Sequence, residues 1–312
     1  MTSPPDTTPP HTLSPTEQRS EDSSDLDTLN TLERLQLLND HDRSAIDAVR
    51  NSLPGLATLV DESATRVREG GTIHYFGAGT PGRLAVLDAA ELIPTFGIDR
   101  NLVTAHIAGG SRALTVAVED SEDSESDGAE AASILGQRDV AIGVTASGRT
   151  RYVGGALQRA REQGALTALI TSNPAPILGG LADIVISVAT GPEVLTGSTR
   201  LGAGTAQKAV LSSFSTALMI ALGRTYSNLM VSVTATNEKL RERTVRILIE
   251  TGAEPSQAPS LLEAAHGELS TAIVALLAHV EVPLAHRALE AAEGSVHHAL
   301  LALINHPESH EQ

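Results

Sequence analysis

Residues 71–96, with the sequence GTIHYFGAGTPGRLAVLDAAELIPTF, decide the fold. A short apolar run stops at a cluster of glycines, and a helical pattern of apolar residues begins directly after it. Short apolar runs that end at turn residues are typical of buried strands. The stretch also raises two questions: what the glycines bind, and why an acid, Glu91, stands beside Leu92, Ile93 and Phe96.

Four further runs repeat the pattern of a short β-branched segment that ends at small or turn residues. They cover residues 102–110, 140–148, 166–173 and 183–190, and helical stretches lie between several of them, for example over residues 150–163. Strands that alternate with helices indicate a mostly parallel sheet covered on both faces. The sequence therefore predicts an α/β fold, a parallel sheet flanked by helices.

The two ends of the chain differ from this pattern. Residues 1–27 are rich in Pro, Ser, Thr, Asp and Glu, and such a segment buries too little apolar surface to order itself, so we expect a disordered tail. Helical patterning continues with few breaks over residues 201–250, two prolines end it, and three short helices are expected beyond. We predict a main domain over residues 28–252 and a small all-helical C-terminal domain over residues 257–312.

Composition excludes several classes of function. The formal net charge of −16 argues against a nucleic-acid partner, because a phosphate backbone needs clustered Lys and Arg. The absence of cysteine excludes disulfides, thiolate metal sites and a thiol nucleophile. No apolar run reaches the roughly 20 residues of a membrane span, and the N-terminus lacks the basic start and apolar stretch of a signal peptide. We expect a soluble, cytoplasmic protein without a membrane partner.

Three loops are candidates for binding a phosphate group: residues 77–83, 145–150 and 197–200. Each offers glycines, hydroxyl groups, an arginine and the start of a helix, whose first N–H groups carry a positive partial charge. The alternative is that these are ordinary turn and N-cap residues. The candidate binding residues in these loops are Gly79, Thr80, Arg83, Ser147, Gly148, Arg149, Thr150, Ser198 and Thr199.

Two carboxylates are candidates for acid–base chemistry. Glu91 has apolar neighbours, and burial among them would raise the pKa of a carboxyl group, as a general acid or base requires. Glu122 lies in an acidic run that reads as a solvated loop. The glycines at 77, 79 and 82 match the dinucleotide pattern formally, but the ribose-binding acid expected about 20 residues later is absent. The histidines form no metal-ligand spacing, so we expect no metal site.

Five long segments resemble the N-acetylmuramic acid 6-phosphate etherases: GAGTPGRLAVLDAAELIPTFG, IAGGSRALTVAVEDSEDS, TASGRTRYVGGAL, GPEVLTGSTRLGAGTAQKAVL and STALMIALGRTYSNLMVSVTATNEKLRERTVRI. The resemblance covers about residues 16–252. It implies a sugar isomerase (SIS) fold, usually dimeric, and a lyase of bacterial carbohydrate metabolism for which no cofactor is expected. The implied reaction splits the D-lactyl ether of N-acetylmuramate 6-phosphate into N-acetylglucosamine 6-phosphate and D-lactate, in N-acetylmuramate catabolism and peptidoglycan recycling.

The resemblance also implies roles for residues. The two catalytic glutamates of the family correspond to Glu91 and Glu122, with the counterpart of Glu91 assigned as the acid; the residues alone leave open which is acid and which is base. Lys208 is retained, and the three loops coincide with the family's sugar-phosphate loops. The chain departs from the family pattern at Pro81 (usually Ser), Arg151 (Pro), Gly202 (Lys) and Ser212 (Asn).

Two alternatives share the expected fold. One is a sugar-phosphate-binding regulator without catalysis, as in the related glucokinase regulatory proteins. The other is an aldose–ketose isomerase, which also abstracts a proton at C2. The product separates them, because only an etherase releases lactate.

Overall fold

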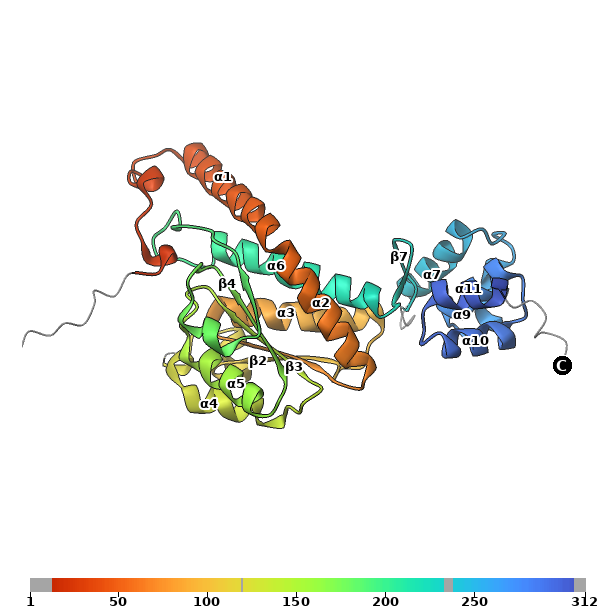
Figure 1. Ribbon diagram of the computed structural model, residues 1–312. Helices are drawn as coiled ribbons and strands as arrows, with labels where there is room; N and C mark the ends of the chain where they lie inside the picture. Colours follow the sequence, from red (N-terminus) through yellow and green to blue (C-terminus); the bar gives the residue numbers. More distant parts are fainter. Residues whose placement is uncertain (1–12, 119, 233–237, 306–312) are drawn as a thin grey trace, which may run out of the picture.

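The computed structural model describes residues 13–118, 120–232 and 238–305. The described part consists of an α/β unit and a separate group of C-terminal helices (Figure 1). A five-stranded parallel sheet with the order β2-β1-β3-β4-β5 forms the centre of the α/β unit. Its strands are β1 (Ile73–Gly77), β2 (Val103–Ile107), β3 (Val140–Thr145), β4 (Leu166–Thr171) and β5 (Ile184–Ser187). The five predicted strands and their parallel arrangement are thus confirmed.

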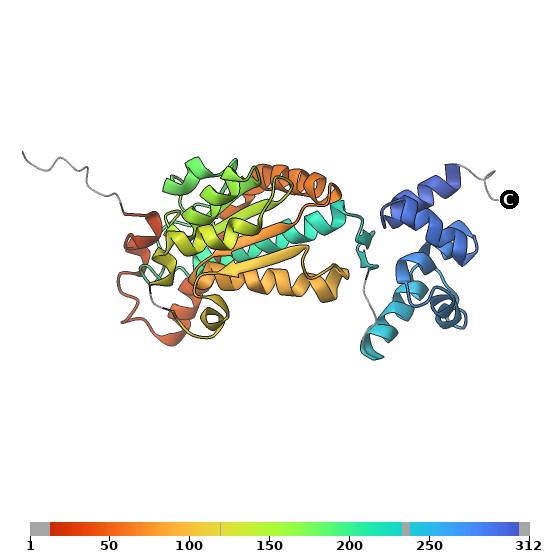
Figure 2. The same cartoon turned by 90° about the horizontal axis from the view of Figure 1, so that it is seen from below.

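Two layers of helices cover the sheet (Figure 2). The layer on one face consists of α1 (Thr31–Val49), α2 (Leu53–Arg68), α3 (Gly79–Phe96) and α6 (Gly202–Ala221). The other face is covered by α4 (Glu125–Ala131) and α5 (Arg151–Glu162). Strands β1, β3 and β4 are buried along their whole length, as expected for a parallel sheet covered on both faces.

Helices α4 and α5 approach each other unusually closely, and glycine makes this possible. A Cβ atom at Gly128 would lie 1.9 Å from the carbonyl oxygen of Tyr152, and one at Gly155 would lie 2.0 Å from that of Glu125. A larger residue at either position would have to push the two backbones apart. The close contact fixes α4, and with it the loop that carries Glu122, against the N-terminal half of α5.

Part of the segment predicted to be a disordered tail, residues 1–27, forms ordered turns. Residues 1–12 lie outside the described residues. Residues 15–17 form a short 3-10 turn whose Thr16 carbonyl accepts a hydrogen bond of 3.2 Å from the Gly197 amide, and Ser14 and Thr16 are buried. A second turn spans Glu21–Ser23. Contacts with the distant loop around Gly197, which composition does not reveal, order this segment.

The long helical stretch predicted over residues 201–250 is interrupted. Helix α6 ends at Ala221, and a hairpin of β6 (Thr225–Tyr226) and β7 (Leu229–Met230) precedes α7 (Glu238–Glu250). Arg224 N and Gly223 N bond back to Met219 and Ile220, and Gly223 has a φ of 74°, so the helix ends in a left-handed turn.

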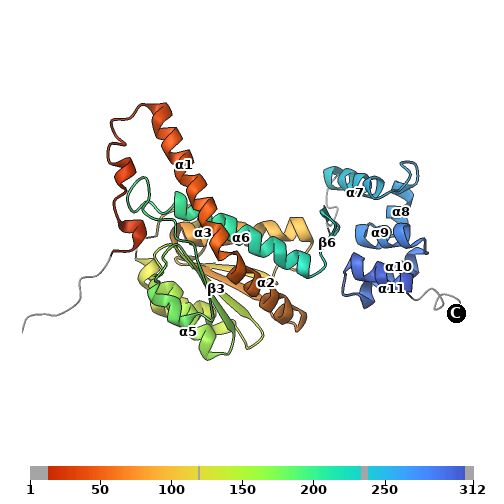
Figure 3. The same cartoon turned by 45° about the horizontal axis from the view of Figure 1, so that its top comes forward.

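Up to residue 305, where the described part of the chain ends, four helices rather than the three predicted follow α7. Figure 3 shows their arrangement. They are α8 (Ala258–Ala264), α9 (Leu269–Ala278), α10 (Val282–Ala291) and α11 (Val296–Asn305). Left-handed residues at Gly267 and Gly294 separate α8 from α9 and α10 from α11. These helices, with α7, enclose a hydrophobic core of their own. Among the described residues, no single helix is long and apolar enough to cross a membrane, although the pair α8 and α9, bent by 113°, has the required length and composition when joined.

Candidate active site

A cavity of about 570 Å³ lies at the carboxyl ends of β1 and β3. In open α/β sheets, ligands bind at this edge. Residues that follow the two strands form its floor, and the loop at Glu122, the N-terminal turn and the loop at Gly197 surround it. The lining consists of Ser14, Glu17, Ala78, Gly79, Thr80, Pro81, Glu122, Asp123, Thr145, Ala146, Ser147, Arg149, Thr150, Arg151, Gly197 and Thr199.

Two helices begin at this cavity without a side-chain cap. The N-cap residues are Ala78 for α3 and Thr150 for α5, and neither side chain bonds to the first helical turn. The Thr150 hydroxyl instead shares a hydrogen bond of 2.7 Å with the Thr145 hydroxyl. The first N–H groups of a helix have no partner within the helix and carry positive partial charge. Two such ends at one cavity form a site suited to a phosphate group.

The third predicted loop contributes to the cavity in a different way. Gly197 and Thr199 line it. The N-terminus of α6, however, is already capped: the amides of Gly202 and Ala203 donate to the carboxylate of Glu193 over 2.9 and 3.0 Å. The expectation that all three loops present a free helix N-terminus is therefore wrong for α6. Glu193 is a residue near the site that the sequence did not reveal, because it stands nine residues before Gly202 and not at the N-cap position, which is Leu201.

The segment that follows β4 holds the loop after β3 in place. The Asn173 side chain donates to the Ser147 carbonyl over 2.9 Å, and the Leu178 amide donates to the Gly148 carbonyl over 3.1 Å. Gly148 has a φ of 70°, which only glycine adopts without strain, and a Cβ there would meet Pro176 at 2.5 Å. This framework presents Ser147, Arg149 and Thr150 along one wall of the cavity.

Two acids enter the cavity from the turn that precedes α4. Glu122 and Asp123 are both exposed and both line the cavity. Ser124 caps α4 by accepting from the Asp127 amide, so the turn at residues 121–123 leads directly into a fixed helix. The structure thus brings Glu122 to the same cavity as Gly79, Thr80, Ser147, Arg149, Thr150 and Thr199, which were predicted from three separate loops.

Glu91 does not lie at this cavity in its own chain. It stands twelve residues after Gly79 on α3, which corresponds to about 18 Å along the helix axis. It is also exposed, because α3 buries Ala89, Leu92 and Phe96 and turns Glu91 outward. The apolar surroundings expected around its carboxylate are therefore absent within a single chain.

Four other predicted binding residues do not line the cavity. Arg83 donates to the carbonyls of Ala113 and Val116, at 2.9 and 3.4 Å, and so holds the segment that follows β2. Lys208 is exposed on α6, beyond its first turn. Ser198 and Gly148 lie in two of the loops around the cavity but do not line it.

A buried polar cluster that the sequence did not reveal joins α3, β1 and α6. The carboxylate of Asp88 accepts from the Tyr75 hydroxyl at 3.0 Å and from the Ser215 hydroxyl at 2.9 Å. Burial raises the pKa of Asp88 to about 6, against the opposing effect of these two hydrogen bonds and of the Lys208 charge. Burial and the nearby Asp88 raise the pKa of Tyr75 as well. The cluster links β1, α3 and α6 through side-chain hydrogen bonds.

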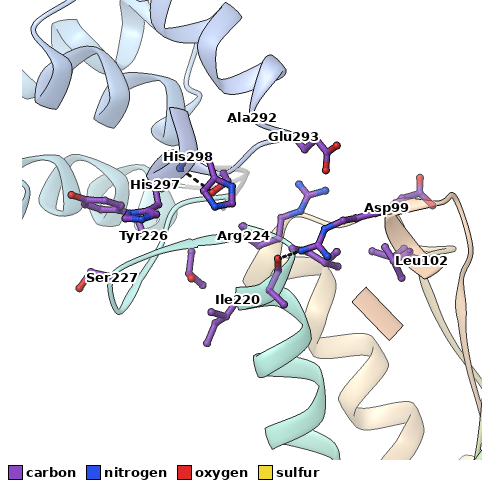
Figure 4. Close-up of a pocket in the computed structure, with 17 residues that line it drawn as sticks. Asp99, Leu102, Ile220, Arg224, Tyr226, Ser227, Ala292, Glu293, His297 and His298 are labelled. Atoms are coloured by element: carbon purple, nitrogen blue, oxygen red, sulfur yellow. Dashed lines mark hydrogen bonds between the residues drawn. The ribbon is translucent and has the colours of Figure 1, made fainter. Parts of the chain in front are cut away.

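A second cavity, of about 1030 Å³, lies between the end of the α/β unit and the C-terminal helices (Figure 4). Charged groups of both signs line it, among them Arg68, Asp99, Arg224 and Glu293. It is larger than the first, but it borders the C-terminal ends of α2 and α6 rather than the carboxyl ends of the strands. The smaller cavity is therefore the candidate active site. Within the described ranges, no three His, Asp or Glu side chains are grouped to hold a metal ion.

Two family models match this chain: the glucokinase regulatory protein N-terminal SIS domain over residues 55–161 and the SIS domain over residues 113–222. An N-acetylmuramic acid 6-phosphate etherase from Thermobifida fusca is 53% identical over 264 residues, 84% of this chain and 87% of that protein. The etherase of Klebsiella aerogenes is 47% identical, over 84% of this chain and 89% of that protein. The chain belongs to the N-acetylmuramic acid 6-phosphate etherase family.

Membership of this family confirms the resemblance stated from the sequence, and the SIS match confirms the predicted fold class. A solved phosphoheptose isomerase from Francisella tularensis is 17% identical, with a TM-score of 0.48 over 61% of this chain and 98% of that one. Three of the four departures from the etherase pattern lie at or near the site: Pro81 and Arg151 line the cavity, and Gly202 starts α6 beside Glu193.

Proposed function

We propose that the cavity at the carboxyl ends of β1 and β3 is where this etherase cleaves the D-lactyl ether of N-acetylmuramate 6-phosphate, in the cytoplasm, to N-acetylglucosamine 6-phosphate and D-lactate. The observation that carries the proposal is the meeting of two uncapped helix N-termini with a carboxylate, Glu122, in one cavity. The first feature suits a phosphate, and the second suits proton transfer at the sugar.

In this proposal the 6-phosphate binds where α3 and α5 begin. Backbone N–H groups of both helices, the hydroxyls of Thr80, Ser147 and Thr150, and the Arg149 guanidinium supply donors to it. Hydrogen bonds to a charged group contribute about 1.5–3 kcal/mol each, so several together fix the sugar in one orientation. Thr199 and Gly197 close the opposite wall.

Glu122 then acts as the base. In the open-chain sugar, C1 is an aldehyde, which makes the proton on C2 acidic. Glu122 takes this proton, lactate leaves from C3, and water adds to the double bond that results. An ether oxygen is a poor leaving group, so a second carboxyl group protonates it as it departs, and two carboxyl groups suffice for the whole reaction.

We further propose that the acid, Glu91, comes from a second copy of the chain in a homodimer. Within one chain, Glu91 lies about 18 Å along α3 from Gly79, which lines the cavity. The residues around Glu91 support an interface, because Leu87 and Ile93 on the same helix are 51% and 42% exposed. Helix α1, which projects from the body in Figure 3, adds Leu32 and Leu35, which are 64% and 58% exposed. Exposed apolar side chains in such number mark a contact surface.

A heterodimer tests this arrangement directly. Glu91→Gln and Glu122→Gln chains carrying different affinity tags are co-expressed, and the mixed dimer is purified through both tags. If Glu91 acts across the interface, one of the two sites retains both glutamates, and about half of the wild-type activity is expected. If Glu91 acts within its own chain, both sites lack one glutamate and the mixed dimer is inactive, as each homodimeric variant is.

The reaction itself is tested with purified protein and N-acetylmuramate 6-phosphate, followed by an enzymatic assay for D-lactate. Release of stoichiometric D-lactate, lost in Glu122→Gln, supports the proposal. Binding without lactate release would favour a regulator, and a ketose product would favour an isomerase.

A further inference from the structure

Glu193 is a fully buried carboxylate with three hydrogen-bond donors. Its Oε1 accepts from the Ala203 amide at 3.0 Å, and its Oε2 accepts from the Gly202 amide at 2.9 Å. The third donor is the Nε2 atom of His41, 3.1 Å from Oε2. A buried carboxylate without such donors would cost several kcal/mol, and the positive end of α6 supports it further.

His41 reaches Glu193 from α1, more than 150 positions away in the sequence, and its side chain is 15% exposed. Because an ionised carboxylate only accepts hydrogen bonds, Nε2 of His41 carries a proton in this contact. A second link runs parallel to it: the Thr205 hydroxyl donates to the Asp42 carboxylate over 2.9 Å. Two neighbouring residues of α1 therefore hold the first turns of α6.

The imidazole of His41 also fills the space where a side chain at position 202 would lie. A Cβ atom at Gly202 would stand 2.4 Å from Nε2 and 2.9 Å from Cδ2 of His41, and 3.3 Å from the Glu193 carboxylate. A side chain at position 202 and the bond between His41 and Glu193 therefore exclude each other. The ring is the end of a movable side chain, so a substitution at Gly202 displaces His41 rather than the backbone.

These contacts close the base of a cavity loop. Glu193 directly precedes residues 194–201, and its hydrogen-bond donors Gly202 and Ala203 directly follow them. The loop between them supplies Gly197 and Thr199 to the cavity lining, and Gly197 also bonds to the N-terminal turn through Thr16. Any loosening where the loop begins and ends moves this wall of the cavity.

We propose that His41 is a positioning residue for substrate binding, which acts by fixing Glu193 and through it the loop of residues 194–201, and that Gly202 is required because of His41. The proposal rests on the function proposed above for the cavity. His41 does not touch the substrate; it sets the place of Thr199 and Gly197.

The test compares His41→Ala, Gly202→Ala and the double variant with wild type. Each single change removes the same hydrogen bond, so each should raise KM about tenfold or more, in line with the loss of a charge-assisted hydrogen bond, while kcat changes less than about threefold. The double variant should be no worse than either single one, since the bond is lost only once. His41→Gln, which keeps a donor, should recover part of the loss.

A matched control is His286→Ala in the C-terminal helices, where His286 contacts Glu268 at 3.1 Å on an exposed surface. It should leave KM unchanged. Hydrogen exchange of residues 194–203, followed by mass spectrometry, gives a readout without substrate, so it tests the contact even where the etherase assay fails. Exchange should speed up in both single variants. Additive losses in the double variant, or unchanged KM and unchanged exchange in His41→Ala, would overturn the proposal.

Discussion

Replacing Asp88 with asparagine should make the α/β unit more stable at neutral pH. Asp88 is held by Tyr75 and Ser215 between β1, α3 and α6. Burial raises its pKa from 3.8 to about 6. A raised folded-state pKa means that the folded protein binds the proton more tightly than the unfolded chain. The associated stability is present below pH 3.8 and is lost as the pH rises through 6.

The size of the loss follows from the pKa difference. At about 1.4 kcal/mol for each pKa unit, the step from 3.8 to about 6 corresponds to about 3 kcal/mol. Asparagine has nearly the shape of the protonated acid, can accept from Ser215 and can donate to Tyr75, and carries no charge to desolvate. Asp88→Asn should therefore match wild type near pH 4 and exceed it by up to about 3 kcal/mol at pH 8.

Urea unfolding at several pH values measures this difference. Tyr226 packs against the core of the C-terminal helices, so every protein in the series carries Tyr226→Phe. The remaining tyrosine signal then comes from the buried Tyr75 and Tyr152 and reports on the α/β unit. The difference between variant and wild type isolates residue 88, because the other carboxylates titrate alike in both. Asp47→Asn, at an exposed position on α1, serves as the control and should show no pH-dependent difference. A variant that is less stable at pH 8, or a difference that does not change with pH, would refute the reasoning.

Three further outcomes are expected. Glu122→Gln should abolish lactate release, while its affinity for the phosphosugar, measured by calorimetry, should stay within about threefold of wild type. When the wild-type reaction runs in D₂O, deuterium should appear at C2 of the product, and a product with hydrogen at C2 would exclude this elimination. Unphosphorylated N-acetylmuramate should bind at least ~100-fold more weakly than its 6-phosphate, and equal affinities would contradict the phosphate site. Burial and the neighbouring His74 lower the pKa of His106 from 6.5 to about 4. The stability associated with neutral His106 is therefore present above pH 6.5 and is lost as the pH falls to 4. His106→Gln should make the melting temperature depend less on pH in this range.

The sheet could be predicted from the sequence because each strand is a local signal. Every strand is a short apolar run that ends at turn residues, and strands buried on both faces need no alternating pattern. The position of the candidate site could be predicted as well, because ligands of open parallel sheets bind at the carboxyl ends of the strands. Loops separated by more than 100 residues in the sequence meet at this edge. These inferences use only local composition and one general property of the fold.

Other features depend on contacts that local composition does not contain. The helical periodicity of α3 shows which of its faces is buried: Ala85, Ala89, Leu92 and Phe96 form one buried stripe, and Glu91 lies outside it. The apolar neighbours of Glu91 in the sequence nevertheless suggested that its side chain would be buried. The cap on α6 requires Glu193 to turn back onto the helix and His41 to arrive from α1. Composition alone suggested disorder for the N-terminal segment, whereas the amide of Gly197 binds it.

In the site proposed above, the distribution of helix caps would let a chain with a net charge of −16 bind a phosphate ester. At physiological ionic strength, charges further away than about 8 Å are largely screened, so the net charge matters less than the groups at the cavity. Glu193 neutralises the N-terminus of α6, whereas the N-termini of α3 and α5 have no side-chain cap. Arg149 precedes α5, and Arg151 is its first residue. Arg151 also faces Glu125 at 3.7 Å, an exposed pair that contributes little. In the proposed site, attraction for the phosphate therefore depends on which helix ends are uncapped, and Glu193, which caps α6, shapes the opposite wall instead.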